Sequence, residues 1–386
     1  TAAWAIITFF LACVNDVPHM MVLRTLNGLA LATLAPVSQV IIAGCTRPEE
    51  RGSYFGRCGM WMMLGSLVSS IFAASISNKT IFGFNGWRVA FSGVAMLSLL
   101  LALMLAKLME EKPQQQTKAV RFNHELETFF RFLRIRSFAV IAIQGMFGTI
   151  PMSAMTFCTM FFQYTGMRDT DAAVLYSLML MAVAVGRLIG GHVGDSLTSW
   201  SRYHGRPLAA QISVFSGIPS IILLFCVVPA QPSSFPFYAF GVIIFGLTSS
   251  WCYSGVNRPI LTEIVPKHNH ARVISWLAAL EGTSSACFGA PVCGILAMKI
   301  FHYMPMFVKT AEIPQSVRQN NAQALASAIA CMCVVPWCIC FAFYGMLHLF
   351  YKRDVECSLK ADLDWETEEN VTLADGLPQC KTSPSA

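Results

Sequence analysis

Residues 186–206 read GRLIGGHVGDSLTSWSRYHGR, a stretch in which an apolar helix ends in a polar and basic loop. Glycines recur at every fourth position from Gly186 to Gly194, so they share one helix stripe that a neighbouring helix can approach closely. Asp195 follows where the apolar run ends, and a carboxylate there faces the unfavourable end of its own helix dipole. We therefore expect a cation, Arg206 or Arg202, or the N-terminus of another helix to meet this carboxylate.

The spacing of these residues resembles the Gly-x-x-x-Asp…Gly-Arg signature of the major facilitator superfamily. The matching positions are Gly191, Asp195, Gly205 and Arg206. In that family the signature occupies the cytoplasmic loop between helices two and three, and it often recurs between helices eight and nine. The inserted residues 196–204 make the spacing longer than usual. The alternative is a polar loop between two unrelated membrane helices.

The composition is that of a polytopic membrane protein. Of 386 residues, 55% are hydrophobic and 12% are charged, whereas a soluble domain carries about 25% charged residues. The net charge of +6 does not indicate nucleic-acid binding, because the basic residues lie in short loops beside apolar runs. The 14 cysteines lack zinc or redox spacing, so we interpret those in apolar runs as packing residues and predict no metal or cofactor.

Apolar runs predict an all-α fold, since a membrane helix needs about 20 mostly apolar residues. Ten runs qualify, although the first is short. They are Ala2–Val14, His19–Cys45, Gly52–Ser77, Trp87–Leu108, Ser137–Tyr164, Ala172–Val193, Leu208–Val228, Phe235–Val256, Val273–Phe301 and Ala322–Tyr351.

Charges in the connecting loops predict the orientation. Loops rich in Lys and Arg alternate with poorer ones, and the positive-inside rule places the rich set, which includes the Asp195 loop, in the cytoplasm. Asn78 begins an Asn-Lys-Thr glycosylation sequon in a loop of the other set, so this asparagine is predicted to lie outside.

A weak internal repeat predicts two helical halves of parallel topology. Gly28-Leu29 and the basic loop that follows it match Gly246-Leu247 and the basic loop that follows that pair. Numbered by the family resemblance, His19–Cys45 is helix four of twelve, so we expect ten helices here and the first two to be absent. The predicted divisions are an N-terminal half (1–109), a cytoplasmic linker with a short surface helix (110–136), a C-terminal half (137–351) and a disordered cytoplasmic tail (352–386).

Further motifs extend the resemblance over nearly the whole chain and favour the Spinster-like branch with its plant and protist relatives. They are Arg24-Thr25-Leu26-Asn27-Gly28, Gly86-Trp87-Arg88, Asn257-Arg258-Pro259, Glu263-Ile264-Val265-Pro266 and Gly289-Ala290-Pro291. The resemblance implies a central cavity bordered by helix eleven.

Four residues are candidates for a substrate or proton pathway. Glu281 lies well inside an apolar run, where a carboxylate is costly and is usually paired or functional. The alternative is a buried structural carboxylate that is hydrogen-bonded to Ser284, Ser285 or another helix. Arg24 could bind an anionic headgroup, pair with a carboxylate or extend to the membrane surface. His192 is a protonation candidate or a packed histidine, and Gln144 could line the cavity.

Gating or stabilising contacts are expected from the signature residues Gly191, Asp195, Gly205 and Arg206, joined by Glu263 and Arg272. The leading hypothesis is a secondary transporter of a lipid-like or polar organic solute that works by alternating access and couples to protons. The competing hypothesis is a transporter-shaped receptor or scaffold. No Walker motif or nucleophile constellation favours an enzyme or an ATP-driven pump.

Overall fold

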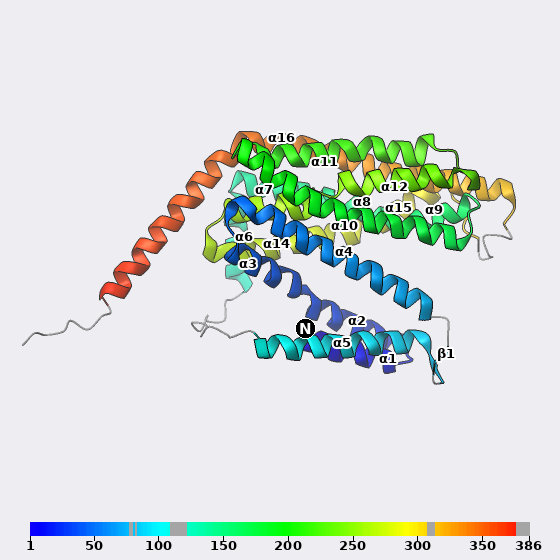
Figure 1. Ribbon diagram of the computed structural model, residues 1–386, viewed down its shortest axis with the longest axis horizontal. Coiled ribbons are helices and arrows are strands. Elements are labelled where there is room, and N and C mark those ends of the chain that lie inside the picture. The colour runs from blue at the N-terminus through cyan, green and yellow to red at the C-terminus, as the bar shows by residue number, and fades with distance from the viewer. Residues whose placement is uncertain (77–79, 82, 109–121, 307–312, 376–386) are drawn as a thin grey trace, which may run out of the picture.

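The computed structural model describes residues 1–76, 80–81, 83–108, 122–306 and 313–375 as a bundle of long helices (Figure 1). The elements of its first part are α1 (Ala2–Cys13), α2 (Val17–Ala32), α3 (Leu34–Cys45), η1 (Pro48–Glu50), α4 (Arg51–Ile76), β1 (Thr80–Ile81), β2 (Phe84–Asn85) and α5 (Gly86–Leu108). Those of its second part are α6 (Phe122–Leu133), α7 (Arg136–Gly148), α8 (Ile150–Ala154), η2 (Met155–Phe157), α9 (Cys158–Tyr164), α10 (Asp169–Trp200), α11 (Gly205–Ile222), η3 (Leu223–Val227), η4 (Pro232–Ser234), α12 (Phe235–Ser249), η5 (Cys252–Asn257), α13 (Arg258–Glu263), η6 (Lys267–Asn269), α14 (His270–Ser284), η7 (Ser285–Gly289), α15 (Ala290–Ile295), η8 (Leu296–Ile300) and α16 (Gln315–Asp375).

The all-α membrane fold is confirmed. Eight helical segments of the described chain are long and apolar enough to cross a membrane. The two remaining predicted segments are also helical, α1 with 12 residues and α4 with 26. Because a helix rises about 1.5 Å per residue, α4 is long enough to cross a hydrocarbon layer about 30 Å thick.

Several of these segments are assembled from shorter helical pieces. Pro36 lies just after the break between α2 and α3, and Pro151 lies in the first turn of α8, where its missing N–H costs nothing. The segment predicted as Phe235–Val256 continues beyond α12 through η5 and α13 to Glu263. That continuation carries polar residues from the predicted basic loop into the interior.

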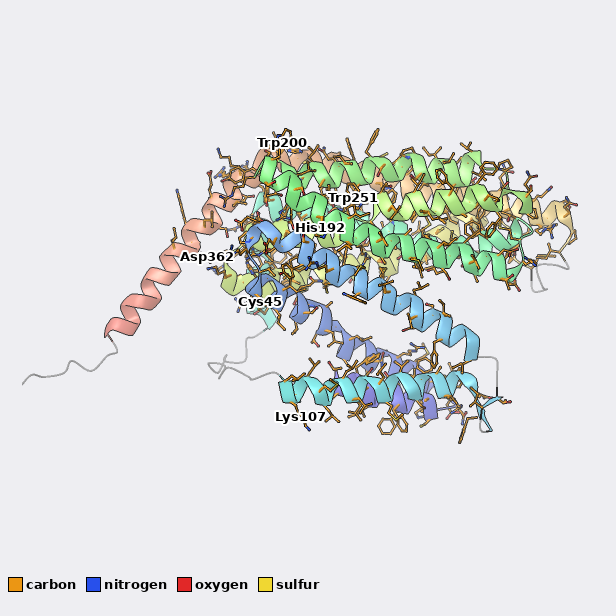
Figure 2. The ribbon with its side chains drawn as sticks, in the orientation of Figure 1. Cys45, Lys107, His192, Trp200, Trp251 and Asp362 are labelled. Carbon is orange, nitrogen blue, oxygen red and sulfur yellow. The ribbon has the colours of Figure 1, made fainter. Side chains whose placement is uncertain are left out.

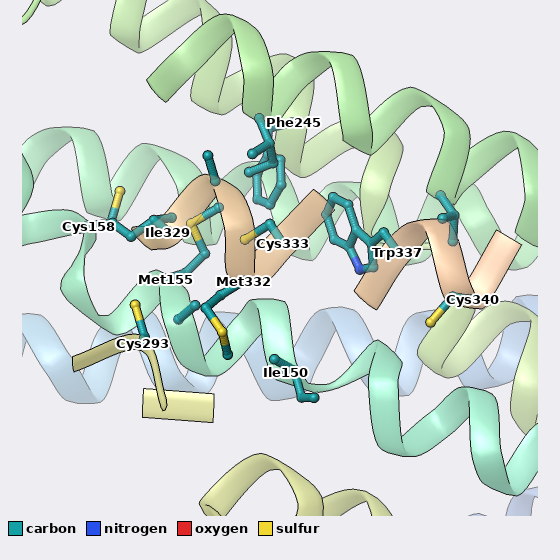
Figure 3. Close-up of a cluster of buried hydrophobic side chains, with 14 of the residues drawn as sticks. Ile150, Met155, Cys158, Phe245, Cys293, Ile329, Met332, Cys333, Trp337 and Cys340 are labelled. Carbon is teal, nitrogen blue, oxygen red and sulfur yellow. The ribbon is translucent and has the colours of Figure 1, made fainter. Parts of the chain in front are cut away.

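One hydrophobic core joins the helices from α6 to α16. Its buried residues run from Phe132 to Val355, and α10 packs against α11 and α12 within it. Cysteines contribute to this core as small apolar side chains: Cys158, Cys293 and Cys333 lie among Met155, Ile329 and Trp337 (Figure 3). This agrees with their interpretation as packing residues, although Cys226 and Cys287 are exposed.

Helices α1 to α5, which we call the first group, are distinct from the second group, α6 to α16, and within the first group α1 packs on α2 and α5. Arg88 Nη1 at the start of α5 donates to the carbonyl of Ala12 at 2.7 Å, and Asn27 Nδ2 in α2 donates to Thr8 Oγ1 at 2.7 Å. Large apolar side chains on the other faces of α5 are exposed, among them Leu97 and Leu103, as expected of a helix that faces lipid.

The two groups of helices meet at one end of the bundle. Along α4, Gly52, Phe55 and Gly56 are buried, whereas Trp61 and Val68 are about two-thirds exposed at 67% and 66%. α4 packs on α10 at its start and diverges from the α10–α12 layer as it runs toward β1 (Figure 1). The contact between the groups is therefore concentrated near the first turns of α4.

The tail after Lys352 differs from the prediction. α16 continues as a helix to Asp375, where we expected disorder from residue 352 onward. Contacts with the bundle explain the difference: Asp354 Oδ2 accepts from the backbone N of Ser137 at 2.8 Å, and Asp362 Oδ1 accepts from that of Lys267 at 3.0 Å. Val355 is also buried, so tertiary contacts that the composition does not reveal hold the helix against the bundle as far as Asp362.

Candidate functional site

A buried arginine joins α11 to three other elements. The Arg206 side chain is fully buried, with Nη1 3.0 Å from Asp195 Oδ1 on α10 and Nε 3.2 Å from Glu263 Oε1 on α13. Its Nη2 donates to the carbonyl of Pro48 in η1 at 2.8 Å. Glu263 also accepts a hydrogen bond from Tyr351 on α16. We call Asp195, Arg206 and Glu263, with the first turn of α4, the clasp.

Asp195 also receives the N-terminus of α4. Its carboxylate accepts from the backbone N of Gly52 at 3.0 Å, from the backbone N of Ser53 at 2.6 Å and from Ser53 Oγ at 2.6 Å. The unpaired N–H groups and the dipole of a helix start both favour a carboxylate there. From the sequence we expected a cation or a helix N-terminus to meet the Asp195 carboxylate, and the structure places both against it. Arg202 does not take part, because its guanidinium lies over the Tyr203 ring at 5.9 Å.

Glycines bring the backbones of α4 and α10 together at the clasp. A Cβ atom on Gly56 would lie 2.7 Å from the carbonyl oxygen of Arg187, and one on Gly191 would overlap the carbonyl of Gly52. His192 lies in the same contact, with Nδ1 3.0 Å from Ser53 Oγ. Figure 2 labels His192 near the place where α10 meets α4, and its side chain is exposed.

A second set of charges lies deeper in the bundle. Arg258 Nη2 on α13 is 2.6 Å from Glu281 Oε2 on α14, and both side chains are buried. The guanidiniums of Arg258 and of Arg187 on α10 lie 4.7 Å and 5.2 Å from the ring centre of Tyr253. We call Arg187, Tyr253, Arg258 and Glu281 the arginine cluster.

The arginine cluster leaves hydrogen-bond donors without acceptors. Nε and Nη1 of both Arg187 and Arg258 are buried and have no partner among the described residues. Nor does any carboxylate of the described chain form an ion pair with Arg187. Among the described residues, Glu281 therefore pairs with Arg258 alone, and the unpaired charge of Arg187 is costly in a medium of low dielectric.

Amide and hydroxyl groups continue the network beside the cluster. Gln144 Oε1 on α7 accepts from Asn257 Nδ2 at 3.1 Å, and Tyr344 Oη donates to Asn257 Oδ1 at 2.8 Å. α7 approaches Glu281 closely, because a Cβ atom on Gly145 would lie 3.0 Å from Glu281 Oε1. Gln144 thus lies in the same interior region as Glu281, bonded to Asn257.

An apolar groove of about 390 Å³ opens between α7, α14, η7 and α16. It starts at Met146 and Ser284, which lie one turn or less beyond Gln144 and Glu281 along their helices and are joined by a hydrogen bond of 2.7 Å. Its remaining lining is formed by Phe147, Ile150, Phe288, Val292, Cys331, Met332, Val335, Pro336 and Ile339.

Comparison with known proteins identifies the family. The model of the major facilitator superfamily matches residues 1–290. The chain belongs to the major facilitator superfamily. It is a multi-pass integral membrane protein.

Two solved structures share this fold, both of a bacterial homologue of the human lysosomal transporter Spinster. The inward-facing and occupied form has a TM-score of 0.57 at 17% identity, covering 92% of this chain and 82% of that chain. The inward-facing and unoccupied form has a TM-score of 0.52 at 15% identity, with 91% and 82% covered. At such identities the likeness concerns the fold.

A curated relative is quinidine resistance protein 1 of Saccharomyces cerevisiae, 26% identical over 113 residues. The match covers 28% of this chain and 19% of the yeast protein.

The facilitator signature is not a loop in this chain. α10 runs to Trp200, so Asp195 and the residues after it are helical, where we expected the helix to end near Val193. The bonds from Arg206 and from α4 stabilise the carboxylate against the dipole of its own helix, so the helix need not end there. Gly205 begins α11 where a Cβ atom would overlap the carbonyl of Leu197.

The other predicted residues lie apart from both sites. Arg272 is 3.3 Å from Glu125 on α6, so it anchors the linker helix instead of joining the clasp. Arg24 is exposed, with its guanidinium 5.2 Å from the centre of the Phe91 ring. Asn78 lies outside the described residues.

Sequence reasoning missed two members of the arginine cluster. Arg187 lies within the predicted run Ala172–Val193, where the rule applied to Glu281 singles out any ionisable residue. Arg258 directly follows the predicted run Phe235–Val256, but it begins α13 and is 1% exposed. The motif Asn257-Arg258-Pro259 resembles the inner end of helix ten in the family, but no local pattern indicates that Arg258 pairs with Glu281.

Within the part of the chain that the structure describes, no three His, Cys, Asp or Glu side chains are grouped so that they could hold a metal ion.

Proposed function

We propose that this chain belongs to a secondary transporter whose two helical halves expose a central site to each side of the membrane in turn. The observation that carries the proposal is the clasp. Asp195, Arg206 and Glu263 all lie in the second group of helices and hold one another, while the first turn of α4 docks on them from the first group.

Only hydrogen bonds and packing join the groups at the clasp, so the contact can open and re-form. When α4 leaves, Asp195 loses three donors from Gly52 and Ser53 but keeps Arg206. Hydrogen bonds to charged groups are worth about 1.5–3 kcal/mol each, so the closed state is favoured until another interaction compensates. By the positive-inside prediction, the clasp closes the cytoplasmic side.

Glu281 is the proposed site of proton coupling. Its pair with Arg258 lies in the interior, about 16 Å along α14 from His270 at the helix start, at 1.5 Å per residue. Protonation of Glu281 would remove the negative charge and leave Arg258 available for another acceptor. A proton and a solute would then be bound in a linked manner, because they use the same guanidinium.

The substrate class supported best is an amphiphilic or lipid-like organic solute. The apolar groove that begins beside Ser284 can take an alkyl portion, while the polar end lies toward Glu281 and Gln144. A fully polar organic solute would leave the groove without an occupant.

Flux in proteoliposomes tests the proposal. Purified full-length protein is reconstituted, a panel of labelled amphiphilic and polar solutes is applied, and uptake is measured with and without a pH gradient. Gradient-driven uptake of an amphiphile supports the transporter. Saturable binding of a solute with no uptake under any gradient favours the receptor or scaffold instead.

The matched variant for coupling is Glu281→Gln, which keeps a hydrogen-bond acceptor but removes the charge. We expect it to bind solute and exchange it across the membrane, yet to lose the acceleration by a pH gradient. If its gradient response equals that of the wild type, Glu281 has no part in coupling.

A further inference from the structure

Two buried arginines, Arg187 and Arg258, face the ring of one tyrosine, Tyr253. Arg187 lies eight residues before Asp195, so it is about 12 Å deeper than the clasp along α10. Arg258 reaches the same ring from α13. Arg187 is 8% exposed and Arg258 is 1% exposed, so both charges are almost completely removed from water.

The charges of this region do not balance among the described residues. Glu281 compensates one guanidinium through a single pair with Arg258 Nη2, and Arg187 has no ion-pair partner. Four nitrogen positions, Nε and Nη1 of each arginine, remain without an acceptor. The Tyr253 ring offers both guanidiniums a cation–π attraction, which does not supply an acceptor for these four nitrogens.

We infer that the arginine cluster is a binding site for an anionic group, a carboxylate or a phosphate, held between Arg187 and Arg258. Such a group supplies the acceptors and the negative charge that the cluster lacks. Guanidiniums suit this role because their fixed N–H geometry matches carboxylate and phosphate oxygens.

One member of the cluster is not fully removed from solvent. Tyr253 is partly exposed, unlike the two arginines that face its ring. Arg187 also lies where α4 packs on α10, since its carbonyl oxygen is the atom that a Cβ on Gly56 would meet. Separation of α4 from α10 would therefore change the surroundings of the bound anion, which links occupancy to the clasp.

This inference rests on the proposed function only in making the anion part of the transported solute; binding itself can be tested without transport. Purified protein in a non-ionic detergent is titrated with dodecyl phosphate, with inorganic phosphate and with dodecyltrimethylammonium, and affinities are measured by calorimetry. We expect dodecyl phosphate to bind at least about tenfold more tightly than the cationic probe.

Matched variants assign the binding to these side chains. Arg187→Gln is expected to weaken binding of the anionic probe by about tenfold or more, since a charged hydrogen-bond donor is lost. Arg202→Gln removes an arginine that lies outside the clasp and outside the cluster, and it is expected to leave the affinity unchanged. If Arg187→Gln fails to yield monodisperse protein, Arg187→Lys keeps the charge but removes the fork, and it is expected to bind more weakly than the wild type.

Two arms distinguish the source of the anion. Displacement of the anionic probe by millimolar inorganic phosphate supports a site for a small free anion, and resistance to phosphate supports an anionic headgroup on an apolar chain. Equal affinity for the anionic and cationic probes, or a folded Arg187→Gln protein with unchanged affinity, overturns the inference. Anion binding without flux would contradict the transporter proposal but support the anion site. Flux together with binding that does not depend on the charge of the probe would support the transporter proposal but contradict the anion site.

Discussion

The clasp and the arginine cluster use the same residue types in opposite ways. In the clasp, Arg206 donates three hydrogen bonds to three acceptors, and Asp195 accepts four from α4 and Arg206. In the cluster, Arg258 has one carboxylate partner among the described residues and Arg187 has none. The guanidiniums of both regions are buried, so the regions differ in how many of their hydrogen-bond donors have acceptors and not in exposure.

A site in which every buried donor and charge has a partner is complete by itself. A site with unpartnered donors can be completed by another molecule. A buried charge is stable when its partners meet every donor, and it is costly when they do not. The clasp therefore stabilises one arrangement of the helices. The cluster stores an unfavourable interaction that an anion can relieve, which is a feature of binding sites more than of packed cores.

The largest effect is expected from Arg206→Gln, because it removes the fully buried cation that pairs with the partly buried carboxylates of Asp195 and Glu263. Breaking a buried pair in this way costs about 3–5 kcal/mol. Thermal unfolding in detergent measures the loss, with Arg202→Gln as the control, whose effect should stay within about 0.5 kcal/mol. Similar melting temperatures for the two variants would contradict the role given to the clasp.

A smaller effect is expected from Gly56→Val, which would push α4 away from α10. Its Cβ meets the Arg187 carbonyl oxygen at 2.7 Å, and overpacking of this kind costs about 1–3 kcal/mol. The opened contact should speed hydrogen exchange of the Gly52 and Ser53 amides, which Asp195 protects. At Gly28 a Cβ has no neighbour within 4 Å, so Gly28→Val is the matched control and should leave that exchange unchanged.

The tail offers a test outside both regions. Asp354→Ala removes the carboxylate that accepts from the backbone N of Ser137 in the first turn of α7, so it acts like the loss of a helix cap. We expect a loss of about 1 kcal/mol in the free energy of unfolding and no change in the exchange of the α4 amides. Faster exchange at α4 would show that the tail supports the clasp directly.

The smallest effect on stability is expected at Arg187. This result would distinguish the arginine cluster most clearly from the clasp. Replacing Arg187 by Met removes a buried charge that has no ion-pair partner, at the cost of a cation–π contact with Tyr253. The two changes oppose each other, so the free energy of unfolding should change by no more than about 1 kcal/mol. A loss as large as that of Arg206→Gln would mean that Arg187 is satisfied within the fold.

The sequence predicted the features that depend on local composition. Ten apolar runs identified helices, and the need of Asp195 for a cation or a helix N-terminus followed from its place at the end of an apolar run. Glu281 was singled out because a carboxylate in such a run needs a partner. The amphipathic spacing from Phe122 to Leu133 likewise predicted α6.

Features that depend on distant contacts were not predicted. The tail from Lys352 to Asp375 appeared disordered because its composition is acidic, yet Asp354 and Asp362 bond to backbone N–H groups far away in the chain. The role of Arg258 was hidden because helix continuation past Val256 depends on packing against α14 and α4.

By itself, the sequence determined that this chain crosses a membrane many times and that certain charges require partners, because hydropathy and the cost of burying a charge belong to each segment alone. Only the tertiary structure decided which partners they have. Asp195 meets Gly52 across 143 residues of chain, and Arg258 meets Glu281 from another helix. Such pairings arise when helices pack, because side chains on different helices become neighbours through crossing geometry that no local pattern encodes.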